Sequence, residues 1–536
     1  MASRRELPEK VLLASIWFSV VFLSFIAVAA TVQEVRLPLN YDWDIDHEIY
    51  FGQELSRGNL IWAVEFHDKL PIVQYLFFLP GMFGSALVWQ LLSVAIVLLS
   101  AAGATTGLLK LREVRELPRE LRAAICFFCG LIVVAPISLI PGGISVINSS
   151  AMSLWFLSSV LLLWWGERES SITPVNLLRL GVICVPGCMA VSIRPYLLPS
   201  LLVVGVFATL FRGHNWASTG AVPRKLASLM IFAASVAIGI SVMNFLPYVI
   251  TGKTHVLWDG LQMLAADLIP TAMAEKFNPL SLGMSPGSLI LPLLALLFFA
   301  LLVVRAAGAA PGEVIASTFS IVGLFVAVAA KHWWDHYLIL FLGPVSLLVF
   351  FVLSGLFKFF SRTFPKTSRP SAHTLLIIAT ISILVGLVGT AAVAFAGEGR
   401  IQESPSERGR KFADSREEII MVIANTVAVD EQFLAPDDMY AHWKLNEPRH
   451  GFPHAENTEH ILQGWWRSIP AVTAFAAPTS LAEYCDLLQF KAVTYIVLPI
   501  NSPLIDCMTT HDSKYEIVTT EDVPSGRSYT VFRMSP

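Results

Sequence analysis

Long apolar runs restrict the fold of this chain more than any other feature. About eleven segments have the roughly 20 apolar residues that cross the hydrocarbon core of a bilayer. Each must be helical, because an isolated strand in lipid leaves its backbone groups unpaired. We therefore predict a polytopic α-helical membrane protein with about eleven transmembrane helices. The runs lie near 11–32, 81–109, 123–140, 149–165, 177–193, 196–211, 227–250, 287–304, 313–330, 336–357 and 373–396.

The composition agrees with this assignment. Of the 536 residues, 55% are hydrophobic and only 14% are charged, whereas a soluble globular protein carries about 25% charged residues. No basic patch interleaved with aromatic residues occurs, so a nucleic-acid partner is not expected. The first apolar run is longer than the apolar core of a cleavable signal peptide, so we predict that it stays as the first span.

The lysines and arginines indicate the orientation. They collect in every second connection, which the positive-inside rule assigns to the cytoplasm. The N-terminus is then cytoplasmic, and an odd number of spans places the C-terminal region outside. The assigned residues are Arg4, Arg5, Lys10, Lys110, Arg112, Arg115, Arg119, Arg122, Arg168, Arg212, Arg224, Lys225, Arg305, Lys358, Arg362, Lys366 and Arg369.

Two parts of the chain follow from this pattern. Residues 1–396 form the predicted transmembrane domain, with a first outer loop at 33–70. Residues 397–536 have ordinary soluble composition with mixed helix and strand signals, so we predict a soluble α+β domain. Its residues 492–498 and 529–533 have the pattern of β-strands.

The cysteines divide between these two parts. Cys485 and Cys507 are the only ones in the external domain, and a disulfide between them suits an oxidising compartment. Two unpaired buried thiols are the alternative. The other four, Cys126, Cys129, Cys184 and Cys188, fall inside apolar runs and are expected to be small core residues.

Two breaks in the apolar pattern have structural meaning. Residues 71–80 precede the second span and are predicted to form an interfacial or re-entrant helix, with a break at Pro80-Gly81. The fifth and sixth runs are separated only by Arg194-Pro195, which predicts a tight external hairpin.

The first outer loop concentrates acidic residues among aromatic and aliphatic ones, in the run YDWDIDHEIY at residues 41–50. Asp46, Ile49 and Tyr50 have helical spacing, which predicts an amphipathic helix starting near Asp46. Asp44 would serve as its N-cap. The candidate functional acids are Asp44, Asp46 and Glu48. The alternative is a capped surface helix with no chemical role.

Two cations are candidates for binding a lipid phosphate. Lys69 follows Asp68 and precedes a proline-led apolar segment, which places it near the headgroup level. A lysine there binds phosphate as a point charge, or extends to the interface with no further role. Arg194 in the external hairpin is the second candidate, with a topological anchor as its alternative.

The first loop resembles a known family. Residues 46–58 (DHEIYFGQELSRG) and 66–71 (FHDKLP) are similar to the first periplasmic loop of GT-C glycosyltransferases, such as the aminoarabinose transferases of lipid A and the protein O-mannosyltransferases. In that family the loop carries acidic residues, an aromatic residue, a glycine stretch and a Lys-Pro-Pro or His-Pro-Pro segment. His336-Tyr337, just before a late span, is similar to a polar-aromatic loop of those relatives.

The resemblance implies a reaction. A sugar would move from a polyprenyl-phosphate carrier to an acceptor hydroxyl at the outer face, with inversion of configuration. The resemblance assigns the general base to Asp46, with Asp44 as the alternative. Lys69, with Arg194, would hold the phosphate.

Binding of the donor would then involve Lys69, Asp68, Arg194, His336 and Tyr337. The acceptor would be an envelope glycan, lipid or protein. No metal site is predicted. A divalent ion bound by Asp44, Asp46, His47 and Glu48 is the alternative, because some branches of the family hold such an ion.

Two other functions compete with this one. A transporter or flippase would carry ionisable residues at mid-membrane depth, whereas the charges here lie at span ends and in loops. A lipid-linked glycan polymerase would have outer loops rich in arginine, whereas these are acidic. The compact loops favour a bacterial inner membrane with a periplasmic C-terminal domain.

Overall fold

The computed structural model describes fifteen segments of the chain, and every structural statement below concerns these residues. They are 43–64, 70–117, 119–134, 143–168, 173–212, 221–268, 311–329, 337–363, 418–428, 431–434, 450–451, 494–502, 504–509, 514–524 and 526–535.

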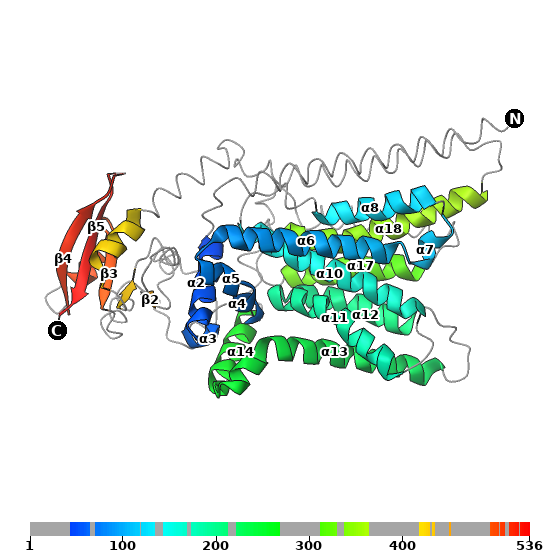
Figure 1. The fold of residues 1–536 in the computed structure, drawn as a ribbon, viewed down its shortest axis with the longest axis horizontal. Coiled ribbons are helices and arrows are strands. Elements are labelled where there is room, and N and C mark those ends of the chain that lie inside the picture. Colours follow the sequence, from blue (N-terminus) through cyan, green and yellow to red (C-terminus); the bar gives the residue numbers. More distant parts are fainter. Residues whose placement is uncertain are drawn as a thin grey trace.

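The membrane part is a bundle of long apolar helices (Figure 1). Four stretches are long and apolar enough to cross a membrane: Ala86–Leu108, Ile147–Glu167, Pro174–Ile193 and Val222–Ile250. Four shorter apolar helices accompany them. Together they match eight of the predicted spans, so the multi-pass helical prediction is confirmed.

The predicted spans at 11–32, 287–304 and 373–396 lie outside the described residues, and the total of about eleven stays a prediction. The bundle helices are α6 (Ala86–Leu108), α8 (Arg119–Val134), α10 (Gly143–Arg168), α11 (Pro174–Ile193), α12 (Leu197–Leu210), α13 (Ala221–Ile250), α17 (Pro311–Ala329) and α18 (Leu338–Thr363).

Helix α10 lies at the centre of the bundle. It contacts α6, α8, α11, α12 and α18, and 83% of its apolar stretch is buried, compared with 11% for α13. Small residues allow this close packing, as is usual where lipid supplies no hydrophobic force between helices. A Cβ built on Gly166 of α10, for example, would lie 2.3 Å from the Ala208 carbonyl oxygen of α12. The four cysteines of the spans are buried and free, as predicted.

Short helices cover one end of the bundle (Figure 1). They are α2 (Trp43–Ser56), α3 (Ile61–Val64), α4 (Ile72–Leu76), α5 (Phe78–Phe83) and α14 (Thr254–Leu268). Residues 71–80 are mostly helical, as predicted, but form α4 and the start of α5 with a turn at Phe77, and the expected break at Pro80-Gly81 is wrong. Pro80 lies in the first turn of α5, where its missing N–H removes no helical hydrogen bond. The chain breaks instead at Gly84, which has φ +53°.

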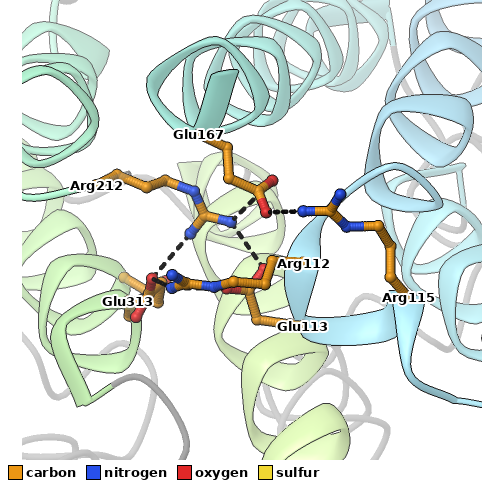
Figure 2. Close-up of polar contacts among 7 residues, drawn as sticks. Arg112, Glu113, Arg115, Glu167, Arg212 and Glu313 are labelled. Carbon is orange, nitrogen blue, oxygen red and sulfur yellow. Dashed lines mark hydrogen bonds and ion pairs between the residues drawn. The ribbon is translucent and has the colours of Figure 1, made fainter. Parts of the chain in front are cut away.

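An ionic cluster occupies the opposite end of the bundle, beside α7 (Arg112–Arg115). Figure 2 shows Arg212 surrounded by carboxylates from three other helices. Its Nη2 is 2.7 Å from Glu113 Oε2 and 3.7 Å from Glu167 Oε2, and its Nη1 is 3.0 Å from Glu313 Oε1. Arg112 and Arg115 complete the cluster through Glu313 and Glu167. Three arginines thus balance three glutamates and tie α7, α10, α12 and α17 together.

The C-terminal part contains a five-stranded sheet in the order β2-β1-β3-β5-β4. Strand β1 pairs in parallel with β2 and β3, whereas β5 pairs antiparallel with β3 and β4. The two predicted strands are confirmed as β3 and β5. Residues 418–426 are helical, and Ile419, Val422 and Ile423 pack against the sheet. The domain boundary near residue 396 lies outside the described residues. The elements are β1 (Gln432–Leu434), β2 (His450–Gly451), β3 (Tyr495–Pro499), α24 (Ile505–Met508), β4 (Tyr515–Asp522) and β5 (Ser528–Met534).

Candidate functional site

The acidic segment of the first loop forms helix α2, as its spacing predicted. The helix begins at Trp43, however, so Asp44 lies within its first turn and the predicted N-cap role is wrong. An N-cap residue is the last residue before a helix, and Asp44 comes after the first helical residue, Trp43. Asp46 follows in the same helix. The side chains of Asp44, Asp46 and His47 lie outside the described residues.

One face of α2 packs against the bundle. Ile45 and Ile49 belong to the same buried cluster as the core of the membrane helices. Glu48 is fully buried, and its spacing from Ile45 and Ile49 places it on the same side of the helix. A carboxylate removed from water in this way requires polar partners. The structure therefore makes Glu48 a buried acid at the interface between the loop and the bundle.

Two glycines fix the position of α2. A Cβ built on Gly52 would lie 2.0 Å from the Phe77 carbonyl oxygen, just before α5. A Cβ built on Gly81 of α5 would lie 2.3 Å from the backbone of Gly52. Contacts below 3.0 Å leave no room for a side chain, so both positions require glycine. The two helices cross in direct backbone contact, which fixes the position of α2 and its acidic residues relative to α5.

Gln74 of α4 supports this arrangement through its buried side-chain amide. Its Nε2 donates to the carbonyl oxygens of Phe51 at 3.0 Å and Asn59 at 2.9 Å. Its Oε1 accepts from the backbone N–H of Ile61 at 2.9 Å. A single side chain therefore pairs backbone groups from three points of the loop, which would otherwise be buried without partners.

Asn244 of α13 joins the loop to the bundle in the same way. Its Oδ1 accepts from the backbone N–H of Ile72 at 2.9 Å, and its Nδ2 donates to Ser192 Oγ at 2.8 Å. Helix α4 thereby attaches to α13 and to the end of α11. That end of α11 leads directly to Arg194.

Arg194 lies in the turn between α11 and α12, the tight hairpin that was predicted. The turn lies at the end of the bundle that carries α2, because Arg212, just beyond the far end of α12, belongs to the ionic cluster at the opposite end. Arg194 is only 3% exposed. Its Nε donates a hydrogen bond to Asn148 Oδ1 of α10, and α10 also contacts α2.

The described side chains that contact Arg194 are neutral. The guanidinium carbon lies 5.7 Å from the centroid of the Tyr337 ring, which packs 5.4 Å from the ring of Tyr196. Arg194 Nη2 has no hydrogen-bond partner among the described residues, and no carboxylate whose side chain is described forms an ion pair with Arg194. Burying a cation without a negative partner is costly, so the described part of this arrangement is suited to an anionic ligand.

The structure thus brings together two of the residues predicted for donor binding, Arg194 and Tyr337. The other three, Lys69, Asp68 and His336, lie outside the described residues, as does Cys485 of the predicted disulfide; the side chain of Cys507 is likewise not described. The described residues hold no group of three His, Cys, Asp or Glu side chains that would bind a metal ion. The ion considered for Asp44, Asp46, His47 and Glu48 involves side chains that are not described and stays an alternative.

Asn148, Gln74 and Asn244 were not predicted from the sequence. Each is an amide inside or beside an apolar run, and a polar residue at that depth is a signal for a buried contact. Their partners, however, lie far away in the chain: Asn148 and Arg194 are 46 residues apart, and Asn244 and Ile72 are 172 apart.

Comparisons with known proteins give only remote likenesses. No model of a known protein family matches the chain, and no curated protein matches it. The chain is similar to a crystal structure of the Archaeoglobus fulgidus oligosaccharyltransferase tethered to an acceptor peptide, with 13% identity and a TM-score of 0.45 over 96% of this chain and 74% of the other. Another structure, of that archaeal enzyme with an inhibitory peptide and a dolichol-phosphate, has 12% identity and a TM-score of 0.42 over the same shares.

The mycobacterial arabinofuranosyltransferase AftD is also similar, with 12% identity and a TM-score of 0.45 over 96% of this chain and 40% of that one. These neighbours are glycosyltransferases, the class that the first-loop motif predicts. At these identities and TM-scores, the likenesses do not identify the function of this chain.

Proposed function

We propose that this protein is a membrane glycosyltransferase that moves a sugar from a polyprenyl-phosphate carrier to an acceptor hydroxyl at the outer face of a bacterial inner membrane. The observation that carries the proposal is Arg194, a buried arginine whose described neighbours are an amide and an aromatic ring. A phosphate would supply the missing negative charge, and a guanidinium binds phosphate through two parallel hydrogen bonds.

The comparison with Arg212 supports this interpretation. Both arginines are buried, yet Arg212 has three carboxylates within 4 Å. A structural arginine in this bundle is therefore neutralised by the chain itself. Arg194 has no carboxylate within ion-pair distance among the side chains that the structure describes, and a phosphate ligand would supply this negative charge.

The location of Arg194 suits a lipid-borne donor. It lies at the end of the bundle covered by α2, so an anion bound there would be near the acids of the first loop. A polyprenyl tail would extend among the apolar helices while its phosphate and sugar reach the polar end. Lys69, from the same loop, is proposed as the second cation on the phosphate.

The proposed reaction is a single displacement. Asp46 takes the proton of the acceptor hydroxyl as general base. The acceptor oxygen then forms a bond to the anomeric carbon, while the bond from that carbon to the lipid phosphate oxygen breaks and the configuration inverts. Arg194 and Lys69 stabilise the charge that develops on the leaving phosphate. Asp44 is the alternative base, and Glu48, buried on the bundle face of α2, is the third candidate.

Native mass spectrometry of the full-length protein in mild detergent tests the proposal. We expect a co-bound polyprenyl phosphate or its sugar adduct in the wild type, or binding of synthetic carrier when it is added. Arg194→Gln and Lys69→Ala should each lose most of this adduct. Arg179→Gln is the matched control, because Arg179 is an exposed arginine on α11, the helix that leads to the hairpin of Arg194. Absence of any polyprenyl species in the wild type, even with added carrier, would overturn the proposal.

A further inference from the structure

We infer that Asn148 is a positioning residue for the donor phosphate: it orients the Arg194 guanidinium and, being neutral, leaves the arginine's charge available to the ligand. This inference deepens the proposed function and rests on it. The juxtaposition that carries it is the hydrogen bond from Arg194 Nε to Asn148 Oδ1 inside the bundle.

The hydrogen bond uses one particular nitrogen of the arginine. Because Nε is held by Asn148, the edge of the guanidinium that carries Nη1 and Nη2 is left for a ligand. Nη2 has no partner among the described residues. Two N–H groups on one planar edge match two oxygens of a phosphate. The amide of Asn148 thus fixes the plane of the group before the ligand arrives.

Tyr337 limits the remaining freedom of the guanidinium. Its ring lies 5.7 Å from the guanidinium carbon and is itself packed against Tyr196 of the α11–α12 turn. Asn148, Tyr196 and Tyr337 are all buried, and they come from α10, from the turn and from the residue just before α18. Three elements of the bundle therefore hold one cation in place, and the contacts that they give it carry no formal negative charge.

The chemical identity of residue 148 is decisive in this arrangement. Aspartate has nearly the same shape as asparagine and would accept the same hydrogen bond. It would also neutralise Arg194, as Glu113 and Glu313 neutralise Arg212. A purely structural role for Asn148 would tolerate or favour aspartate. A role in keeping the charge of Arg194 for a phosphate would not.

A different role for Asn148 is excluded by its burial. Asn148-Ser149-Ser150 has the form of an N-glycosylation sequon. All three residues are fully buried within α10, and a glycan acceptor must lie at an accessible surface. The asparagine therefore acts inside the protein.

The test measures binding of synthetic polyprenyl monophosphate to the full-length protein in detergent, for the wild type, Asn148→Asp and Asn148→Ala. We expect Asn148→Asp to bind on the order of 10- to 100-fold more weakly, the range of a lost hydrogen bond to a charged group. Asn148→Ala should lose less, because the arginine keeps its charge and loses only its orientation. Polyprenol without phosphate should bind all three proteins equally.

Asn176→Asp is the matched control. Asn176 Oδ1 also accepts a hydrogen bond from an arginine, Arg179 Nη1, at 3.4 Å, but this pair is on the exposed part of α11. This variant should bind polyprenyl phosphate like the wild type. Thermal unfolding of each variant, followed in the same detergent, shows whether it is folded.

The outcomes separate the two proposals. If the wild type binds polyprenyl phosphate and Asn148→Asp binds it equally well, Asn148 has no positioning role, although the proposed function stands. If the wild type binds inorganic phosphate or phosphatidylglycerol as tightly as polyprenyl phosphate, and Asn148→Asp abolishes that binding, Asn148 does position an anion-binding arginine, but the donor assignment is wrong. If the wild type binds none of these anions, both proposals are wrong.

Discussion

Gly81 of α5 lies directly against Gly52 of α2, so that a Cβ built on Gly81 would lie 2.3 Å from the Gly52 carbonyl carbon. The helix that carries the candidate acids is thereby fixed to the helix that leads into the first described span. An added methyl group at either position must push the two backbones apart, because no flexible side chain can move away.

We therefore expect Gly81→Ala to lower the stability of the protein by about 1–3 kcal/mol, the usual cost of overpacking, and to weaken sugar transfer by displacing α2. Thermal unfolding in detergent and a transfer assay measure the two effects. Gly181→Ala is the control, because Gly181 lies in α11 and its added Cβ would meet nothing within 4 Å. An alanine there should leave stability unchanged or raise it by up to about 1 kcal/mol. Equal behaviour of the two variants would contradict the close helix crossing.

Removing Gln74 should loosen the first loop. Gln74→Ala leaves a buried N–H and two carbonyl groups without their partner, and each such group costs about 1–3 kcal/mol. We expect faster proteolysis in the loop and a lower melting temperature. Gln90→Ala is the comparison, because Gln90 is also buried and its Nε2 has no described partner. A larger loss at Gln90 than at Gln74 would count against the bridging role.

Arg212 should be far more important to stability than Arg115. Arg212→Gln leaves three glutamates around a neutral side chain, and breaking a buried ion pair costs about 3–5 kcal/mol. Arg115 is more than half exposed and pairs only with Glu167 among the residues that the structure describes, so Arg115→Gln should cost at most about 1 kcal/mol. Melting temperatures of the purified variants measure the difference. Donor binding per folded molecule should be unchanged in Arg115→Gln.

The ionic cluster also predicts acid sensitivity. Burial alone would raise the pKa of Glu113, but the charges of Arg212 and Arg112 and its hydrogen bonds hold this pKa below its usual value. A carboxyl group whose pKa is lowered by folding stabilises the protein above its unfolded pKa of about 4.3, and the contribution is lost as the pH falls through the folded pKa. Stability should therefore fall below about pH 4, and Glu113→Gln should reduce that part of the pH dependence. If Glu113→Gln loses stability at acidic pH to the same extent as the wild type, Glu113 does not cause the acid sensitivity.

Turnover measurements on variants of Asp44, Asp46 and Glu48 distinguish which of these acids of α2 is the general base. Asp46→Asn should reduce sugar transfer on the order of 10²- to 10⁴-fold, the usual contribution of a general base, while binding of the polyprenyl-phosphate donor is retained. Asp44→Asn and Glu48→Gln should have smaller effects on turnover. Single-turnover transfer from a labelled donor gives the rates. If Glu48→Gln alone abolishes transfer without unfolding the protein, the buried acid is the base.

The membrane helices could be predicted from the sequence because lipid imposes one rule on every span. The runs that became α6, α10 and α11 were found for this reason, and so was the hairpin at Arg194. The end of the short helices before α6 was placed wrongly, because Pro80-Gly81 looks like a break in the sequence, whereas Pro80 occupies a tolerated first-turn position and Gly84 makes the turn.

The candidate site was predicted only in part. Arg194 and Tyr337 were selected separately, one from its hairpin and one from a family resemblance, and only the folded bundle shows that they meet. Asn148 could not be selected, because its importance depends on the arginine that α11 brings to it from 46 residues further along the chain. That no described carboxylate side chain forms an ion pair with Arg194 is likewise a property of the packing and not of any local pattern.

The arginines of the ionic cluster are also relevant to membrane insertion. Arg112, Arg115 and Arg212 are among the positive charges from which the positive-inside rule predicts a cytoplasmic location for their loops. In the folded bundle they form a neutral group with Glu113, Glu167 and Glu313. Acidic residues contribute little to the choice of orientation, so the predicted signal for insertion comes from the arginines alone. In the predicted orientation, the same side chains would serve first as the positive signal for insertion and then as ion-pair partners between helices, so the positive charge of that signal is balanced in the folded bundle.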